Sequence, residues 1–110
     1  MANKYFRKPL IPAAATETTI YTVPAANSAV LSSLRATNTN ASVAAISVNL
    51  YPLGGATAYA LLKTYALPTS QTMDIFSGVP CILEATDVLK VTSSVADVTF
   101  VLSYLEADRS

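Results

Sequence analysis

The stretch that decides the fold is Val43-Ala44-Ala45-Ile46-Ser47-Val48-Asn49-Leu50-Tyr51. In an extended chain, successive side chains point to opposite faces, so Ala44, Ile46, Val48 and Leu50 share one face. The other face carries mostly small or polar side chains. Ile and Val also suit a pleated sheet better than a helix, because their branched Cβ restricts χ1. The stretch therefore predicts a β-strand with one buried face.

The same pattern extends in both directions along the chain. Residues 98–105 carry apolar side chains on both faces, which predicts a strand covered from both sides. Residues 58–67 are rich in Ala and Leu and also suit a short helix, but the alternation of Tyr59, Leu61 and Lys63 favours a strand. The remaining strands are expected at Thr18–Val23, Val30–Thr37, Thr72–Phe76, Ile82–Leu83 and Val88–Ser93.

Turn-forming residues recur about every ten positions, which is the spacing of antiparallel all-β domains and not of βαβ units. Residues 17–110 are therefore expected to form one antiparallel two-sheet sandwich of about seven or eight strands, either a Greek key or a jelly roll. Its core is predicted from the alternating positions, namely Leu34, Ile46, Val48, Leu50, Val91, Phe100 and Leu102.

The first sixteen residues differ in character and are expected to lie outside the sandwich as an extended basic arm. Pro9 and Pro12 favour an extended backbone, which lowers the entropy lost on docking. Tyr5 and Phe6 are predicted to anchor in apolar pockets of a partner, and the three cations Lys4, Arg7 and Lys8 to pair with its carboxylates. The alternative is a disordered tail without a partner.

The low charge of the chain predicts self-association. Hydrophobic residues make up 52% of the sequence and charged residues only 13%, about half the usual charged share. A homo-oligomer, most simply a trimer, would cover part of such a surface. The candidate contact residues are Tyr51, Tyr59, Tyr65 and Leu105. The alternatives are a monomer kept soluble by Ser, Thr and Asn, and ordinary packing of these side chains under loops.

The composition alone argues against several classes of function. The chain has no histidine, only three glycines and a net charge of zero. We therefore expect no catalytic residues, no metal site, no cofactor and no direct nucleic-acid binding. Cys81, the single cysteine, lies in an apolar run and is interpreted as a small buried hydrophobe. No segment has the pattern of a signal peptide or the length of a membrane span, so we expect synthesis in a host cytoplasm and no membrane partner.

Several segments together resemble a known class of proteins. They are Ile20-Tyr21-Thr22-Val23-Pro24-Ala25, the Asn-Thr-Asn turn at 38–40, the strand at 43–50, residues 83–91, and the closing Val98-Thr99-Phe100-Val101-Leu102-Ser103-Tyr104-Leu105-Glu106. Over residues 18–106 the chain is similar to the small β-sandwich structural proteins in virions of tailed bacteriophages, which include head decoration (cement) proteins and tail-associated proteins.

The resemblance implies a non-enzymatic virion protein and supplies no functional residues. One reading is a decoration protein that binds and stabilises the shell of the major capsid protein. The other is a tail or fibre-base component, or a module that binds the host surface. The sequence leaves head and tail open.

Overall fold

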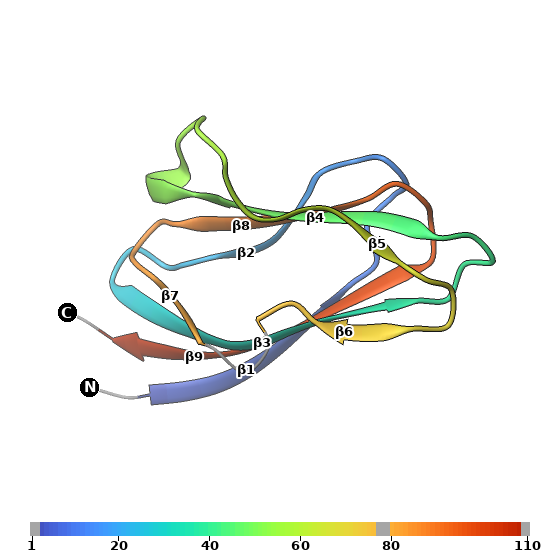
Figure 1. The fold of residues 1–110 in the computed structure, drawn as a ribbon. Helices are drawn as coiled ribbons and strands as arrows, with labels where there is room; N and C mark the ends of the chain where they lie inside the picture. Colours follow the sequence, from blue (N-terminus) through green and yellow to red (C-terminus); the bar gives the residue numbers. More distant parts are fainter. Residues whose placement is uncertain (1–2, 77–79, 109–110) are drawn as a thin grey trace.

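The computed structural model describes residues 3–76 and 80–108. Two antiparallel β-sheets pack face to face (Figure 1). Within the described residues the elements are β1 (Asn3–Leu10), β2 (Thr18–Thr22), β3 (Asn27–Asn38), β4 (Ala44–Tyr51), the 3-10 turn η1 (Pro52–Gly54), β5 (Tyr59–Leu67), β6 (Thr72–Asp74), β7 (Cys81–Leu83), β8 (Val88–Ser93) and β9 (Val98–Asp108).

The strand order is that of a jelly roll. One sheet has the order β1-β9-β3-β6, with β7 also paired to β3, and the other has the order β2-β8-β4-β5. Strands of the first half of the chain pair with strands of the second half: β1 with β9, β2 with β8, β3 with β6 and β7, and β4 with β5. The predicted antiparallel two-sheet sandwich is confirmed, in its jelly-roll form.

The core lies between the two sheets. Six of the predicted core residues are fully buried there: Leu34, Ile46, Val48, Val91, Phe100 and Leu102. Leu50 packs against this core but is only partly buried, because it lies near the end of β4, next to η1. The side chains that the predictions did not include, such as Ile20 and Leu31, are also fully buried and extend the core along β2 and β3.

The N-terminal segment differs from the predicted arm. Asn3–Leu10 is strand β1, paired antiparallel with β9 from Asn3↔Ala107 to Leu10↔Phe100. Without β1, the backbone of β9 would have an uncovered edge directly beside the buried side chains of the core, and unpaired buried backbone groups are costly. Pro9 fits an edge strand, where its nitrogen needs no partner if it faces away from the sheet. The prolines thus indicate an extended chain correctly, and the chain is paired.

Two buried polar side chains fix the turns at opposite ends of the sandwich. Asp87 accepts hydrogen bonds from the backbone N–H of Leu53 and of Glu84, both at 2.9 Å, and so ties η1 to the turn between β7 and β8. Asn38 donates from Nδ2 to the carbonyls of Ser42 and Leu67 at 2.9 and 3.0 Å. Among the described residues, no buried side-chain nitrogen or oxygen lacks a hydrogen-bond partner.

Candidate interaction surfaces

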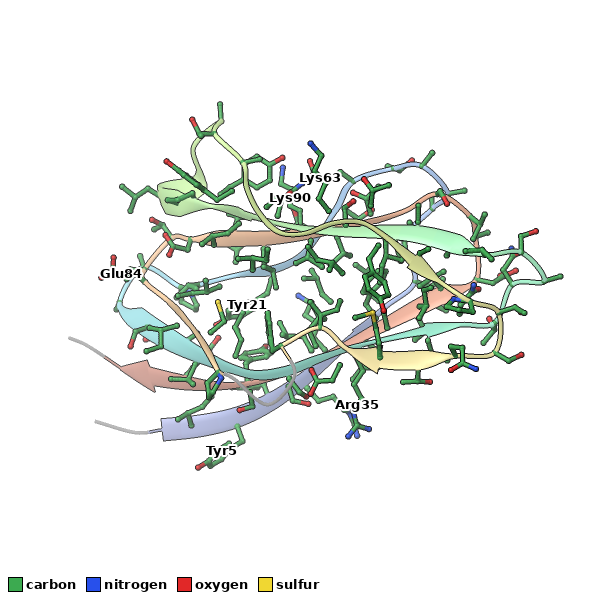
Figure 2. All side chains as sticks on the ribbon, viewed as in Figure 1. Tyr5, Tyr21, Arg35, Lys63, Glu84 and Lys90 are labelled. Atoms are coloured by element: carbon green, nitrogen blue, oxygen red, sulfur yellow. The ribbon has the colours of Figure 1, made fainter. Side chains whose placement is uncertain are left out.

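The predicted basic segment lies on the outermost strand of the five-stranded sheet, where its two aromatic side chains point in opposite directions. Tyr5 is 83% exposed and projects from the outer face of the sheet (Figure 2). Phe6 faces the other way and stacks on Tyr104, with ring centroids 5.3 Å apart. Arg7 and Lys8 are exposed. Tyr5 and Phe6 therefore present their rings on opposite faces of the sheet, and Phe6, although it stacks on Tyr104, keeps 40% of its side chain exposed. That the two aromatics anchor in a partner stays a prediction.

Phe6 belongs to an aromatic cluster at the β1–β2 side of the sandwich. The ring of Tyr21, on β2, lies 4.3 Å from that of Tyr104, on β9. The Tyr21 hydroxyl donates to Glu106 Oε2 at 2.5 Å, while Asn27 Nδ2 lies 3.4 Å from the other carboxylate oxygen. Burial, and then the hydrogen bond and charge of Glu106, raise the pKa of Tyr21 well above its usual range. Because Phe6 and Tyr104 lie on one sheet and Tyr21 on the other, this cluster joins the two sheets.

Sequence reasoning missed this cluster. Tyr21 and Glu106 are 85 residues apart, and neither lies in a pattern that points to the other. Glu106 follows the alternation of its strand, but Tyr21 does not, because Ile20 and Tyr21 are both buried at a register shift in the pairing of β2 with β8. Neither segment therefore indicates the other as its partner.

Tyr51, predicted as a contact residue, is engaged within the chain. Its hydroxyl donates to Glu17 Oε1 at 2.7 Å, and Asn49 Nδ2 donates to Glu17 Oε2 at 2.9 Å. Lys90 Nζ lies 4.5 Å from the centre of the Tyr51 ring, in cation–π geometry. The hydrogen bond from Asn49, and then that from Tyr51, lower the pKa of Glu17 despite some desolvation. The outer face of the four-stranded sheet therefore satisfies its own polar groups here.

Tyr59 and Tyr65 lie on β5, the edge strand of the four-stranded sheet. Their exposed fractions are 56% and 46%, and that of Leu61 is 40%. The pairing of β5 with β4 is irregular, with two register shifts, and Thr64 has a φ of 51°, which is unusual for a β-branched residue. β5 is thus an exposed apolar edge whose only charged residue is Lys63.

Leu105 lies in a row of apolar side chains that crosses the outer face of the five-stranded sheet. The strand registers place Tyr5 beside Leu105, Leu105 beside Val30, and Val30 beside Ile82. Leu105 and Val30 are partly exposed, and Ile82 is 70% exposed. We call these four residues the outer row. Sequence reasoning placed Leu105 on a contact surface and missed Ile82, which it included in the apolar run around Cys81.

The described residues show no cluster of side chains that could bind a metal ion. No group of three or more His, Cys, Asp or Glu side chains among them is arranged to hold a metal ion. Cys81 is free and partly buried. Burial, and then the charge of Asp87, raise the pKa of its thiol, which reduces the reactive thiolate. Within the part of the chain that the structure describes, no helix has the length and hydropathy needed to cross a membrane.

Comparison with known proteins gives similarity in fold. No protein-family model and no curated protein matches the sequence. Among solved structures, a subunit of Bacillus endospore appendages, which are disulfide-linked pili, matches with a TM-score of 0.60 and 16% identity, over 99% of this chain and 88% of that one.

Two structures of infectious bursal disease virus also match. The Gx strain gives a TM-score of 0.56 and 10% identity, and T=1 particles derived from the virus give 0.57 and 11%. In both, 94% of this chain is covered, but it spans only about a third of the viral chain, 32% and 31%. At these identities the likeness shows that all of these proteins share the two-sheet fold.

Proposed function

We propose that this chain is a non-enzymatic structural protein of a bacteriophage virion, a decoration protein that binds the shell of the major capsid protein and stabilises it. The observation that carries the proposal is where the apolar surface lies. Tyr5, Ile82, Tyr59 and Tyr65 are between 46% and 83% exposed, and all lie on edge strands. Exposed apolar edges are a liability in a free monomer and an asset in an assembly.

The comparisons support an assembly subunit. The fold is shared with a chain of T=1 particles derived from infectious bursal disease virus, and residues 18–106 resemble virion proteins of tailed bacteriophages. In this proposal the chain is a homotrimer made in the host cytoplasm and incorporated into the virion. Its exposed Arg7 and Lys8 contact carboxylates of the neighbouring shell protein, and it needs no cofactor, nucleic acid or membrane.

A second candidate is a subunit of a tail or another fibre. The observation that favours it is coverage: this chain spans 88% of the endospore appendage subunit but about a third of the viral chains. A small jelly roll that accounts for nearly the whole of a fibre subunit is a closer match in size than one that is part of a larger viral chain.

Copy number and position on the particle separate the two candidates. Virions that contain this protein are purified, and its amount is measured against the major capsid protein on a stained gel. A decoration protein is present in a number comparable to the shell subunits, and gold-labelled antibody marks the head. Few copies with label on the tail would favour the second candidate, and absence of the protein from the particle would overturn both.

A further inference from the structure

We infer that copies of this chain join side by side, with β1 of one copy adding antiparallel to β7 of the next so that Tyr5 lies beside Ile82. The inference rests on the proposed function only in that the chain assembles with itself. The contact is head-to-tail, so it closes into a trimer if the rotation between neighbours closes the ring and otherwise forms an open row. The inference specifies this interface: the strand that adds to β7 belongs to a second copy of the chain.

The first step is that β1 and β7 lie at opposite edges of the five-stranded sheet as far as the structure describes it, with β6 pairing farther along the same side of β3 as β7. Within the described chain, β1 pairs only with β9, and β7 pairs only with β3. On the other side of each strand, no described strand pairs with its backbone N–H and C=O groups, and an edge of this kind is a template for another strand.

Strand direction is the second step. β1 is antiparallel to β9, β9 to β3, and β3 to β7. Directions alternate across these four positions, so β1 and β7, at the two ends, run in opposite directions. When the molecule is repeated sideways in the same orientation, β1 of the new copy meets β7 as an antiparallel neighbour, which is the better-paired arrangement. The sheet continues through the junction without a change of pattern.

The outer row is the third step, because it sets the register. Tyr5, Leu105, Val30 and Ile82 lie at one level across the sheet, and the two most exposed members are those at the two edges. Sideways addition with Tyr5 beside Ile82 buries both against each other and continues the row into the next copy. Cross-strand aromatic–β-branched pairs of this kind stabilise sheets.

Charge is the fourth step. Residues 3–10 contain three cations and no carboxylate, whereas Glu84 directly follows β7 and residues 80–84 contain no Lys or Arg. Glu84 is exposed at the end of β7 (Figure 2). A basic edge meeting an acidic edge favours this head-to-tail contact over pairing of two β1 strands, which would bring like charges together.

Disulfide trapping tests the register. In a Cys81→Ser background, one protein carries Tyr5→Cys and a second carries Ile82→Cys, and the two are mixed under mild oxidation. Directly opposed residues have Cβ atoms about 4.5–5.5 Å apart, close enough for a disulfide after small adjustments. We expect a crosslinked dimer in the mixture and little in either protein alone. A chain that carries both cysteines should give a ladder of higher species.

The matched control replaces Tyr5→Cys by Arg7→Cys, which is also exposed on β1 but lies two residues from the level of Ile82. It should crosslink at least about fivefold less, since the separation along a strand is roughly 7 Å. Equal crosslinking by Arg7→Cys would overturn the register. Dimers formed by Tyr5→Cys alone would show two-fold pairing of β1, and dimers of Ile82→Cys alone would show face-to-face packing of outer rows. Either result overturns the proposal.

The size of the uncrosslinked protein, measured by light scattering at the same concentration, separates this inference from the proposed function. An oligomer that binds particles but gives no Tyr5–Ile82 crosslink leaves the function standing and removes the inference. A protein that is monomeric and does not bind particles removes both.

A second variant pair tests the backbone contact. If the nitrogen of Pro9 faces away from β9, the N–H of Arg7, two residues earlier, also points to the free edge. Arg7→Pro then removes a donor from the interface, while Arg7→Ala removes only the side chain. We expect Arg7→Pro to weaken self-association roughly threefold to tenfold beyond Arg7→Ala, with unchanged circular dichroism. Equal association of the two variants would contradict the edge contact.

Discussion

The outer faces of the two sheets differ in whether their exposed side chains find partners within the chain. On the four-stranded sheet, Glu17 binds Asn49 and Tyr51, and Lys90 covers the Tyr51 ring, so polar and aromatic groups satisfy one another within the chain. On the five-stranded sheet, the outer row leaves Tyr5 83% and Ile82 70% exposed, and no hydrogen-bond network among the described residues covers them. The outer face of the four-stranded sheet therefore pairs its polar groups within one copy of the chain, whereas that of the five-stranded sheet leaves apolar side chains exposed.

This difference teaches that exposure of an aromatic residue is not enough to identify an interface. Tyr51 and Tyr5 look alike in the sequence, but Tyr51 has its hydroxyl and its ring both engaged. No residue in the described part of the chain forms a side-chain hydrogen bond or a ring contact with Tyr5. The residues expected to drive assembly are exposed apolar side chains such as Tyr5, which a neighbouring copy would bury.

The comparison depends first on the separation of inner and outer faces along β9. Phe100 is fully buried and Val101, the next residue, is partly exposed. We expect Phe100→Ala to lower the free energy of unfolding by about 3–5 kcal/mol, measured by chemical denaturation, and Val101→Ala to cost less than about 1.5 kcal/mol. Similar costs for the two would mean that β9 does not divide the faces in this way.

The aromatic cluster under β1 should give the next largest effect. Tyr21→Phe removes the hydroxyl that donates to Glu106, which should cost about 1–2 kcal/mol. Because the folded pKa of Tyr21 lies above the ordinary value of 10.0, its contribution is present below pH 10 and is lost as the pH rises further. The difference in unfolding free energy between the two proteins should therefore shrink above pH 10. A constant difference up to pH 11.5 would show that the hydroxyl is not held by this bond.

One substitution on each outer face sharpens the comparison directly. Ile82→Ser should change the free energy of unfolding by less than about 0.5 kcal/mol and weaken self-association about tenfold or more, since it removes an apolar group that the contact buries. Tyr51→Phe should lower stability slightly, through loss of the hydrogen bond to Glu17, and leave association unchanged. Sedimentation velocity and thermal unfolding measure the two effects. The reverse outcome, with Tyr51→Phe affecting association, would exchange the roles of the two faces.

The smallest effect is expected from Glu17→Gln. The folded pKa of Glu17 lies below the ordinary value of 4.5, so its charge contributes stability above pH 4.5, and this is lost as the pH falls through the lower folded value. Because Glu17 is exposed, solvent screening limits the contribution to no more than about 0.5 kcal/mol. The variant should be slightly less stable than the parent at pH 7 and equal to it near pH 2. A difference that persists at pH 2 would have to come from packing and not from charge.

The parts that the sequence predicted well are those governed by alternation. The strand at 43–51 is β4 (Ala44–Tyr51), and the expected strand at 58–67 is β5 (Tyr59–Leu67), because a half-buried strand carries its period in its side chains. β1 carries no such period: Lys4, Arg7 and Lys8 interrupt it, and Arg7 and Lys8 are exposed although they lie on opposite faces. Its pairing is made by backbone groups, which every residue type possesses.

The surroundings of the Ile82 and Tyr51 side chains also could not be predicted from the local sequence. Both belong to apolar or alternating segments, but their exposure depends on which strands lie beside them. Ile82 is exposed because β7 alternates around it, between the partly buried Cys81 and the buried Leu83. Tyr51 finds Glu17 through the approach of β2 to β8 and β4. These partners lie far apart in sequence, so no local pattern reports them.

The pairing of β1 with β9 has a consequence for how the protein is made. β9 lies between β1 and β3 and is the last strand that the structure describes. The five-stranded sheet therefore lacks a central strand until residues 98–108 have left the ribosome. β2 likewise waits for β8. Long-range closures of this kind are slow compared with local hairpins. The five-stranded sheet can therefore close only after residues 98–108 have been synthesised, and a nascent chain stalled before residue 98 leaves β1 and β3 without their shared neighbour, a substrate for chaperones and proteases.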